Sequence, residues 1–185
     1  MHSVSVRLEE TIDPVELGAR TGLLWSRHGL VLAGIGEAVR IPVARPDGAT
    51  GAQALLAALS GDNALDVPAT GPVAFGALPF DRHASGELIV PQVVIGTDPA
   101  GNRWITTTGV SVDEGIAMAV DVLAAESTAP QATTYELTSA VTPELWRDDI
   151  VATVRDRILA GEFNKVVLAR ELRLTTDQPI DVAAV

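Results

Sequence analysis

The sequence predicts an α+β fold in which antiparallel sheets carry helices on their outer sides. Short apolar runs of strand length follow one another without the regular alternation of strand and helix that a parallel sheet requires. Sixteen glycines and eleven prolines among 185 residues supply many turns between short elements. Hydrophobic residues make up 47% of the chain and charged residues 20%, which is the balance of a protein that buries a core.

The first third of the chain is expected to hold several short strands and two helices. Val4, Val6 and Leu8 alternate with polar residues and predict the first strand. Asp13 before Pro14 is a typical helix start, because aspartate caps the end and proline presets the backbone. The same rules predict strands over residues 23–27 and 30–33, joined through residues 27–29, then a strand over 37–44 and a helix over 50–60 that ends at Gly61.

The middle of the chain is expected to continue the sheets. Apolar runs predict strands over residues 72–78 and 103–108. Two further runs, over residues 87–90 and 92–95, flank Pro91, which suits a sheet edge or a bulge because proline cannot donate to a neighbouring strand. Spaced apolar residues then predict a helix over residues 112–126.

The last third has the clearest signals. A strand is expected over residues 133–138, and a capping hydroxyl, a proline and an acid at residues 142–144 predict the start of a helix. Apolar residues recur every fourth position along this helix and predict a face turned toward a core, while Gly161 ends the helix. The stripe consists of Trp146, Ile150, Val154 and Ile158. A long strand is expected over residues 163–174.

Composition excludes several functional classes. The chain has no cysteine, so disulfides, thiolate metal sites and a cysteine nucleophile are excluded. Its net charge of −11 repels phosphate backbones, and nucleic acid is not an expected partner. No run approaches the ~18 apolar residues of a membrane span, and the charged N-terminal segment lacks the apolar core of a signal peptide. We therefore expect a cytoplasmic protein that does not bind membranes, whose oligomeric state stays open.

Two possible sites are better explained as ordinary structure. The GIG sequence at residues 34–36 lacks the third glycine of a dinucleotide fingerprint and precedes an expected strand where that motif needs a helix. The histidines, His2, His28 and His83, are scattered and have no partner at metal-ligand spacing.

Lys165 is the residue that the sequence singles out. It is the single lysine of a chain with twelve arginines, and arginine cannot act as a base in a protein. In an extended strand, Phe163 and Val167 would lie on the same face as Lys165. An apolar setting disfavours the charged ammonium and makes lysine a better base, although a solvated lysine at a strand entrance has the same spacing.

The residues around Lys165 resemble a known family. GEFNKVVLAR at residues 161–170 is similar to the GxxxKVVLSR segment of isochorismate synthases, which belong to the chorismate-utilising enzymes. GALPFD at residues 76–81 resembles the family's GA-x-PFD segment, and WSR at 25–27 with GIGEA at 34–38 resembles its W-x-R … G-x-G-x-A stretch. The resemblance implies the N-terminal part of an anthranilate- and aminodeoxychorismate-synthase-like fold.

The resemblance also implies a reaction. The position of Lys165 is typically glutamine in the members that add ammonia and lysine in those that add water. The implied activity is the Mg²⁺-dependent conversion of chorismate to isochorismate, in which Lys165 takes a proton from the water that attacks C2 while the C4 hydroxyl leaves. Glutamine could not take up that proton.

The family's acidic glutamate and magnesium ligands have no counterparts here. Residues 1–185 are therefore expected to be an incomplete N-terminal portion of one chorismate-binding domain, inactive by itself, whose residues 178–185 begin a further helix. Two alternatives stay open: a salicylate synthase, which goes on to eliminate pyruvate, and a non-catalytic binding module of half length. Menaquinone, catecholate-siderophore and salicylate-siderophore pathways all remain possible users of the product.

Overall fold

The computed structural model describes residues 1–44, 48–81, 83–125 and 134–177. The chain forms two compact units, Met1–Ser127 and Thr128–Val185. The helix start expected at residues 178–185 lies outside the described residues. Among the described residues, the first unit contains two sheets and three helices, and the second contains a two-stranded antiparallel sheet and one long helical segment.

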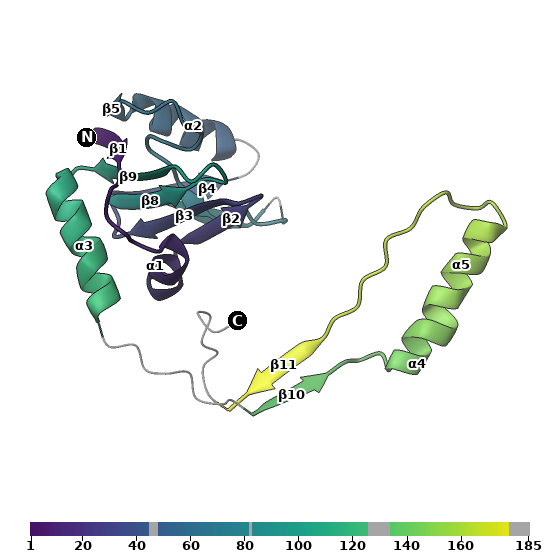
Figure 1. Ribbon diagram of the computed structural model, residues 1–185. Coiled ribbons are helices and arrows are strands. Elements are labelled where there is room, and N and C mark those ends of the chain that lie inside the picture. Colours follow the sequence, from purple (N-terminus) through teal and green to yellow (C-terminus); the bar gives the residue numbers. More distant parts are fainter. Residues whose placement is uncertain (45–47, 82, 126–133, 178–185) are drawn as a thin grey trace. The chain divides into compact units, whose positions relative to one another are not determined.

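A six-stranded sheet forms the centre of the first unit (Figure 1). Every neighbouring pair in it is antiparallel except β1 and β5, which run parallel. The predicted antiparallel α+β class is thus confirmed. In spatial order the strands are β2 (Leu24–Arg27), β3 (Leu30–Ile35), β8 (Val93–Thr97), β9 (Arg103–Thr108), β1 (His2–Arg7) and β5 (Ser60–Asn63).

The hairpin between β2 and β3 follows from local turn chemistry. His28 and Gly29 both have positive φ, at 51° and 81°, as a two-residue turn with the twist of the flanking strands requires. The register pairs Arg27 with Leu30, in agreement with the predicted hairpin.

The two faces of the six-stranded sheet bury different side chains because residues alternate along each strand. One face carries Ile35, Val93 and Ile105, which pack under α1 (Pro14–Thr21) and α3 (Val112–Ala124). The opposite face buries Leu32, Val94 and Trp104 together with Phe75. Both helices begin at side-chain caps, Asp13 for α1 and Ser111 for α3, and Asp13 was expected from the sequence.

A smaller sheet holds β4 (Val39–Ala44), β7 (Ser85–Val90) and β6 (Phe75–Gly76) in the order β4-β7-β6. Helix α2 (Gly48–Ala58) packs against it around a core that includes Ile41, Val43 and Val90. The expectation that Pro91 lies at an edge or bulge is wrong. Pro91 is buried and lies between β7 and β8, where the chain leaves one sheet and enters the other, so it interrupts no ladder.

The strand expected at residues 72–78 and the end of the helix expected at residues 50–60 differ from the structure. Only Phe75–Gly76 of the strand expected at 72–78 is paired, because Val73 and Ala74 are used to cover two hydrophobic cores. Gly61 does not end α2. It belongs to β5, where a Cβ would lie 2.6 Å from the Ser3 carbonyl oxygen, so glycine allows the close approach of β1 and β5.

The described part of the second unit consists of a two-stranded antiparallel sheet and a helical segment that lies between its strands in the sequence. Strands β10 (Tyr135–Thr138) and β11 (Arg173–Thr176) pair antiparallel. The helical segment comprises α4 (Pro143–Leu145), a π-helical stretch (Trp146–Val151) and α5 (Ala152–Leu159). Thr142 caps it through a hydrogen bond from the Leu145 amide to Thr142 Oγ1, 3.2 Å, as the sequence predicts.

The strand expected at residues 163–174 is mostly unpaired. Only Arg173 and Leu174 of that range belong to β11. Within residues 134–177 the only strand that pairs with β11 is β10, and β10 is four residues long. Residues 165–172 are irregular, since a strand needs a neighbour to accept and donate its backbone hydrogen bonds. The predicted stripe on the helix is its less exposed face, but its four residues are only half-buried.

Candidate active site

Lys165 lies shortly after the end of the helical segment, beyond a turn that the local sequence specifies. Gly161 has a φ of 80°, a left-handed conformation that glycine adopts without strain. Its amide donates to the Ile158 carbonyl oxygen at 3.0 Å, and the Glu162 amide donates to the Arg157 carbonyl oxygen at 3.0 Å. These bonds end the helix, and the chain then continues toward Lys165.

Arg157 makes two contacts with this turn. Its Nε donates to Glu162 Oε2 at 2.7 Å, and its guanidinium carbon lies 4.9 Å from the centroid of the Phe163 ring. Both partners are substantially exposed, so the ion pair adds little to stability. The two contacts nevertheless restrain the path of the chain just before Lys165.

The side chains of the following segment differ in exposure. Val166 is 36% exposed and Val167 is 81% exposed, whereas Leu168 and Arg170 are half-buried. Leu168, Ala169, Arg170 and Glu171 lie beside Trp146 and Ile150 of the helical segment, and Lys165 is exposed. The strict alternation expected for a strand is therefore not seen in this irregular segment, where odd- and even-numbered residues both lie beside the helix.

The apolar setting expected for Lys165 is not formed by the described residues. Phe163 and Val167 are themselves exposed, and Lys165 is exposed with them. Within residues 134–177 no strand or helix packs on that side, and no residue is fully buried. The segment presents its lysine to the surface.

The far end of the segment is held by strands β10 and β11. Ser139 Oγ donates to the Glu171 carbonyl oxygen at 3.0 Å, next to the pairing of Thr138 with Arg173. Between this end and the helix lies a cavity of about 430 Å³. Its walls include Val141, Trp146, Ile150, Leu168 and Arg170. Sequence reasoning does not single out Arg170. The signal that could have found it is its position two residues after Leu168, since side chains two residues apart in an extended chain lie on the same side.

The described residues do not gather a metal site. Across residues 1–44, 48–81, 83–125 and 134–177, no three histidine, aspartate or glutamate side chains lie close enough together to hold an ion. His2 pairs with Asp62, with 3.3 Å between Nε2 and Oδ2, at the surface of the first unit. The described residues therefore do not form a magnesium site.

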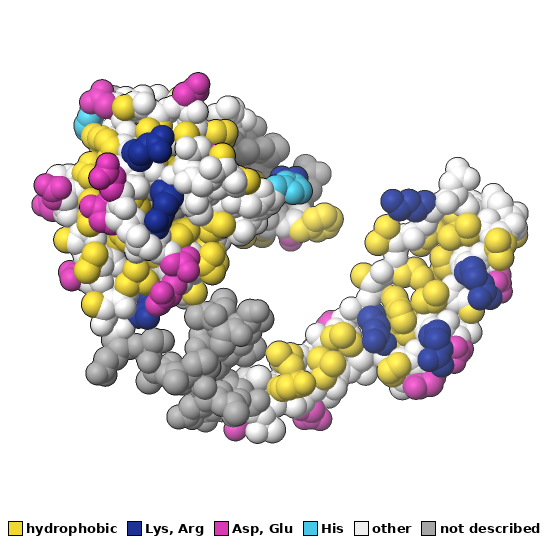
Figure 2. Space-filling view, in the orientation of Figure 1, with side chains coloured by type: hydrophobic (Ala, Val, Ile, Leu, Met, Phe, Trp, Pro, Cys, Tyr) yellow, Lys and Arg dark blue, Asp and Glu magenta, His cyan; other side chains and the backbone are white. Residues whose placement is uncertain are grey.

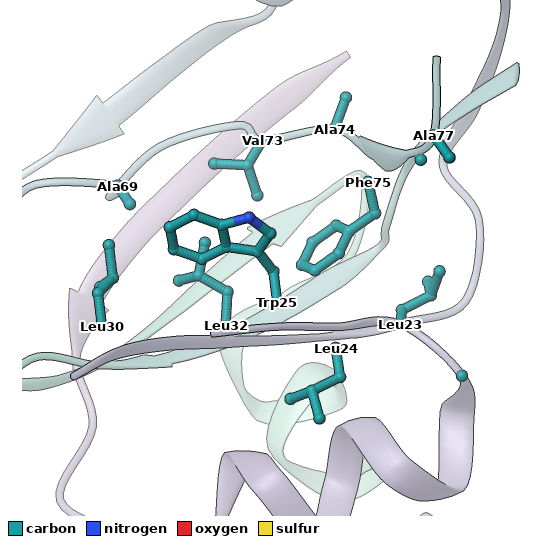
Figure 3. A pocket seen from close by; sticks show the side chains of 12 residues that line it. Leu23, Leu24, Trp25, Leu30, Leu32, Ala69, Val73, Ala74, Phe75 and Ala77 are labelled. Atoms are coloured by element: carbon teal, nitrogen blue, oxygen red, sulfur yellow. The ribbon is translucent and has the colours of Figure 1, made fainter. Parts of the chain in front are cut away.

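The first unit has a larger cavity of about 560 Å³, shown in Figure 3. Leu23, Leu30 and Leu32 line it together with Val73 and Phe75, and the side chain of Trp25 lies in the middle of the labelled group. None of the lining residues is charged. A ligand with two carboxylates, such as the chorismate implied by the sequence resemblance, would lose its hydration in this cavity without gaining a cation. The cavity therefore does not suit a substrate of that kind.

The GIG sequence at residues 34–36 lies where strand β3 ends. Gly34 and Ile35 belong to β3, Gly36 has a φ of 66°, and strand β4 follows, in agreement with the prediction that this is no dinucleotide fingerprint. The three histidines are exposed. Among the described helices, none has the length and apolar character needed to cross a membrane.

Comparison with known proteins gives two matches, one to a family model and one to a single protein, which cover different lengths of the chain. The model of the family described as "Chorismate binding enzyme" matches residues 9–185. The chain is 31% identical over 136 residues to the isochorismate synthase MenF of Bacillus subtilis (strain 168). That match covers 63% of the chain and 28% of the relative, so the chain spans well under half the length of this relative. No solved structure matches the chain.

Proposed function

Because the chain belongs to the chorismate-binding enzyme family, we propose that the protein of which it is a part converts chorismate to isochorismate, with Lys165 as the general base. The family match includes Lys165, the single lysine among 185 residues. The similar protein of Bacillus subtilis carries the name isochorismate synthase. The presence of a lysine at position 165 is the observation that carries the proposal. The addition of water needs a group that takes up a proton, and an uncharged lysine can do so.

The chemistry assigned to this chain is one proton transfer. The uncharged amine Nζ of Lys165 takes a proton from a water molecule while the oxygen of that water bonds to C2 of chorismate. The ring double bonds shift, and the C4–O bond breaks with its electron pair on oxygen. A separate acid protonates that oxygen, so one water enters, one leaves and the product is an isomer of the substrate.

Lys165 needs partners for this role. A base lowers the barrier only when the departing hydroxide is stabilised at the same time. We also propose a requirement for Mg²⁺. The ligands of Mg²⁺ and the acid that protonates the leaving oxygen would come from other residues. The described residues contain no cluster of acidic or histidine side chains that could hold the metal. Residues 1–185 by themselves are accordingly expected to be inactive.

The proposal is tested by product analysis of the protein encoded by the complete reading frame. The purified protein is incubated with chorismate and Mg²⁺, and products are separated by chromatography, with residues 1–185 alone as the negative control. We expect isochorismate to accumulate without pyruvate, and chelation of the metal to stop its formation. Unchanged chorismate in the complete protein would contradict the proposal.

Salicylate and pyruvate appearing together would replace the proposed product with that of a salicylate synthase. In that case isochorismate is an intermediate, and the same base still adds the water. The time course separates the two enzymes, because a salicylate synthase releases pyruvate in step with chorismate consumption.

A further inference from the structure

Arg170 is the exception among the arginines of the second unit. Within residues 134–177, four of five arginines pair with a carboxylate, at N–O distances between 2.7 and 3.2 Å. The four pairs are Arg147–Asp148, Arg155–Asp156, Arg157–Glu162 and Arg173–Glu171. All eight of these side chains are largely exposed, where pairing matters least. Arg170 is half-buried and has no carboxylate partner among the described residues.

The surroundings of Arg170 favour an anion. Its guanidinium carbon lies 5.8 Å from the centroid of the Trp146 ring, so the indole face supports the charged group on one side. Its Nη1 atom is buried and has no hydrogen-bond partner among the described residues. A buried guanidinium nitrogen without an acceptor is costly, and arginine cannot lose its charge to avoid that cost. The missing partner must therefore be an acceptor, and a carboxylate would match both the charge and the planar donor geometry.

Space for such a partner exists beside Arg170. The cavity of about 430 Å³ that Arg170 lines is within the range of small-ligand sites, and Trp146, Ile150 and Leu168 form apolar walls. The one acid on its lining, Glu171, is paired with Arg173 through Oε1 at 3.2 Å. An incoming carboxylate with an apolar body would meet one unpaired cation in a mostly apolar groove that is open to solvent.

We propose that Arg170 binds a carboxylate at this cavity, stacked on Trp146, and so holds the segment that carries Lys165 against the helix. The carboxylate has two possible sources with the same chemistry: an aspartate or glutamate side chain of the complete protein, or a carboxylate of the substrate itself. Since Lys165 is exposed and does not line this cavity, a protein carboxylate would act by positioning that residue, whereas a substrate carboxylate would be bound directly.

The test compares Arg170→Met with Arg173→Met in the complete protein. Both variants remove an arginine from the same segment, but Arg173 is exposed and its loss leaves an exposed acid unpaired. A third variant, Arg170→Lys, keeps the charge and loses the flat donor group that stacks on the indole. Melting temperature without substrate, KM for chorismate and kcat are measured for each.

With a protein carboxylate, Arg170→Met lowers the melting temperature by about 4 °C or more and lowers kcat while KM stays within about twofold, because a buried acid is left unpaired. With a substrate carboxylate, the melting temperature without substrate is unchanged and KM rises by about tenfold or more. Arg170→Lys is expected to recover part of the loss in either case. If Arg170→Met matches Arg173→Met in melting temperature, KM and kcat, the proposal is wrong.

The kinetic measurements rest on the proposed function, and the melting temperature does not. If the complete protein leaves chorismate unchanged, a lower melting temperature of Arg170→Met relative to Arg173→Met still supports a buried carboxylate partner. In an inactive protein, equal melting temperatures of the two variants both without and with chorismate would overturn the inference, because neither a protein carboxylate nor a bound one would then depend on Arg170.

Discussion

At the scale of single residues, the proposed general base, Lys165, is exposed in the part of the chain that the structure describes. Lys165→Ala in the complete protein should lower turnover by about 10²–10⁴-fold, the usual contribution of a general base, while the KM for chorismate changes little. Steady-state kinetics with chorismate measures both quantities. Near-normal turnover would show that another group takes the proton.

Lys165→Arg is the matched control, because it keeps a positive charge of similar reach but cannot act as a base. We expect it to be as inactive as Lys165→Ala. Full activity in Lys165→Arg would mean that position 165 contributes charge alone, and the assigned proton transfer would then be wrong.

Gly96 is a residue whose lack of a side chain decides the packing of a neighbour. It faces Trp104 across β8 and β9, and a Cβ at position 96 would overlap the buried Trp104 ring. Gly96→Ala should therefore lower the free energy of unfolding by about 1–3 kcal/mol, measured by urea denaturation. Gly51→Ala is the control. It lies in helix α2 with open space around it and should raise stability by about 0.5–1 kcal/mol.

At the scale of elements, the start of α3 is set by a reciprocal cap. Ser111 Oγ accepts from the Glu114 amide at 3.3 Å, and Glu114 Oε2 accepts from the Ser111 amide at 2.8 Å. Ser111→Ala should lower the free energy of unfolding by about 1 kcal/mol, because it leaves amides of the first turn unsatisfied. Ser85→Ala, in a strand with no cap role, serves as the comparison in the same denaturation experiment.

The same cap makes stability depend on pH. The hydrogen bonds from the Ser111 amide, and then from its hydroxyl, hold the pKa of Glu114 below its ordinary value of 4.5. Because the pKa of Glu114 is lower in the folded state than in the unfolded state, the ionised carboxylate stabilises the fold. This stabilisation is complete above pH 4.5 and is lost as the pH falls through the pKa of the folded state. The difference in unfolding free energy between the wild type and Glu114→Gln should thus shrink below pH 4.5. A difference that stays constant down to about pH 3 would contradict this.

At the scale of the whole molecule, the two units differ in how much apolar surface they bury. The first unit has three hydrophobic cores, whereas no residue within 134–177 is fully buried. Figure 2 shows hydrophobic side chains at the surface of the second unit. Its exposed large apolar residues are Tyr135, Leu137, Leu145, Val151, Leu159, Phe163, Val166, Val167, Leu172 and Leu174.

This difference predicts the hydrogen exchange of residues 1–185. Amides of the central strands β3, β8 and β9 should be strongly protected, because both faces of their sheet are covered. Amides of residues 143–176 should exchange much faster, since their hydrogen bonds are open to solvent. Mass spectrometry of exchanged peptides measures both regions, and equal protection would show that the second unit is covered in solution.

The sequence by itself determined the features that depend on a few neighbouring residues. Asp13 and Thr142 cap helices, His28 and Gly29 form a hairpin turn, and Gly161 ends the long helical segment, as predicted. Each rests on local backbone geometry and on hydrogen bonds within one turn, which residue type sets directly.

Only the tertiary structure decided what depends on distant partners. Pro91 proved to mark a change of sheet, and the strand expected at residues 163–174 is paired only over its last two residues, because strand length depends on a neighbour elsewhere in the chain. The surroundings of Lys165 are of this kind. An apolar flank in the sequence becomes an apolar environment only when another surface covers it, and the described residues leave that side exposed. The orphaned nitrogen of Arg170 likewise emerges only once helix and segment are packed together.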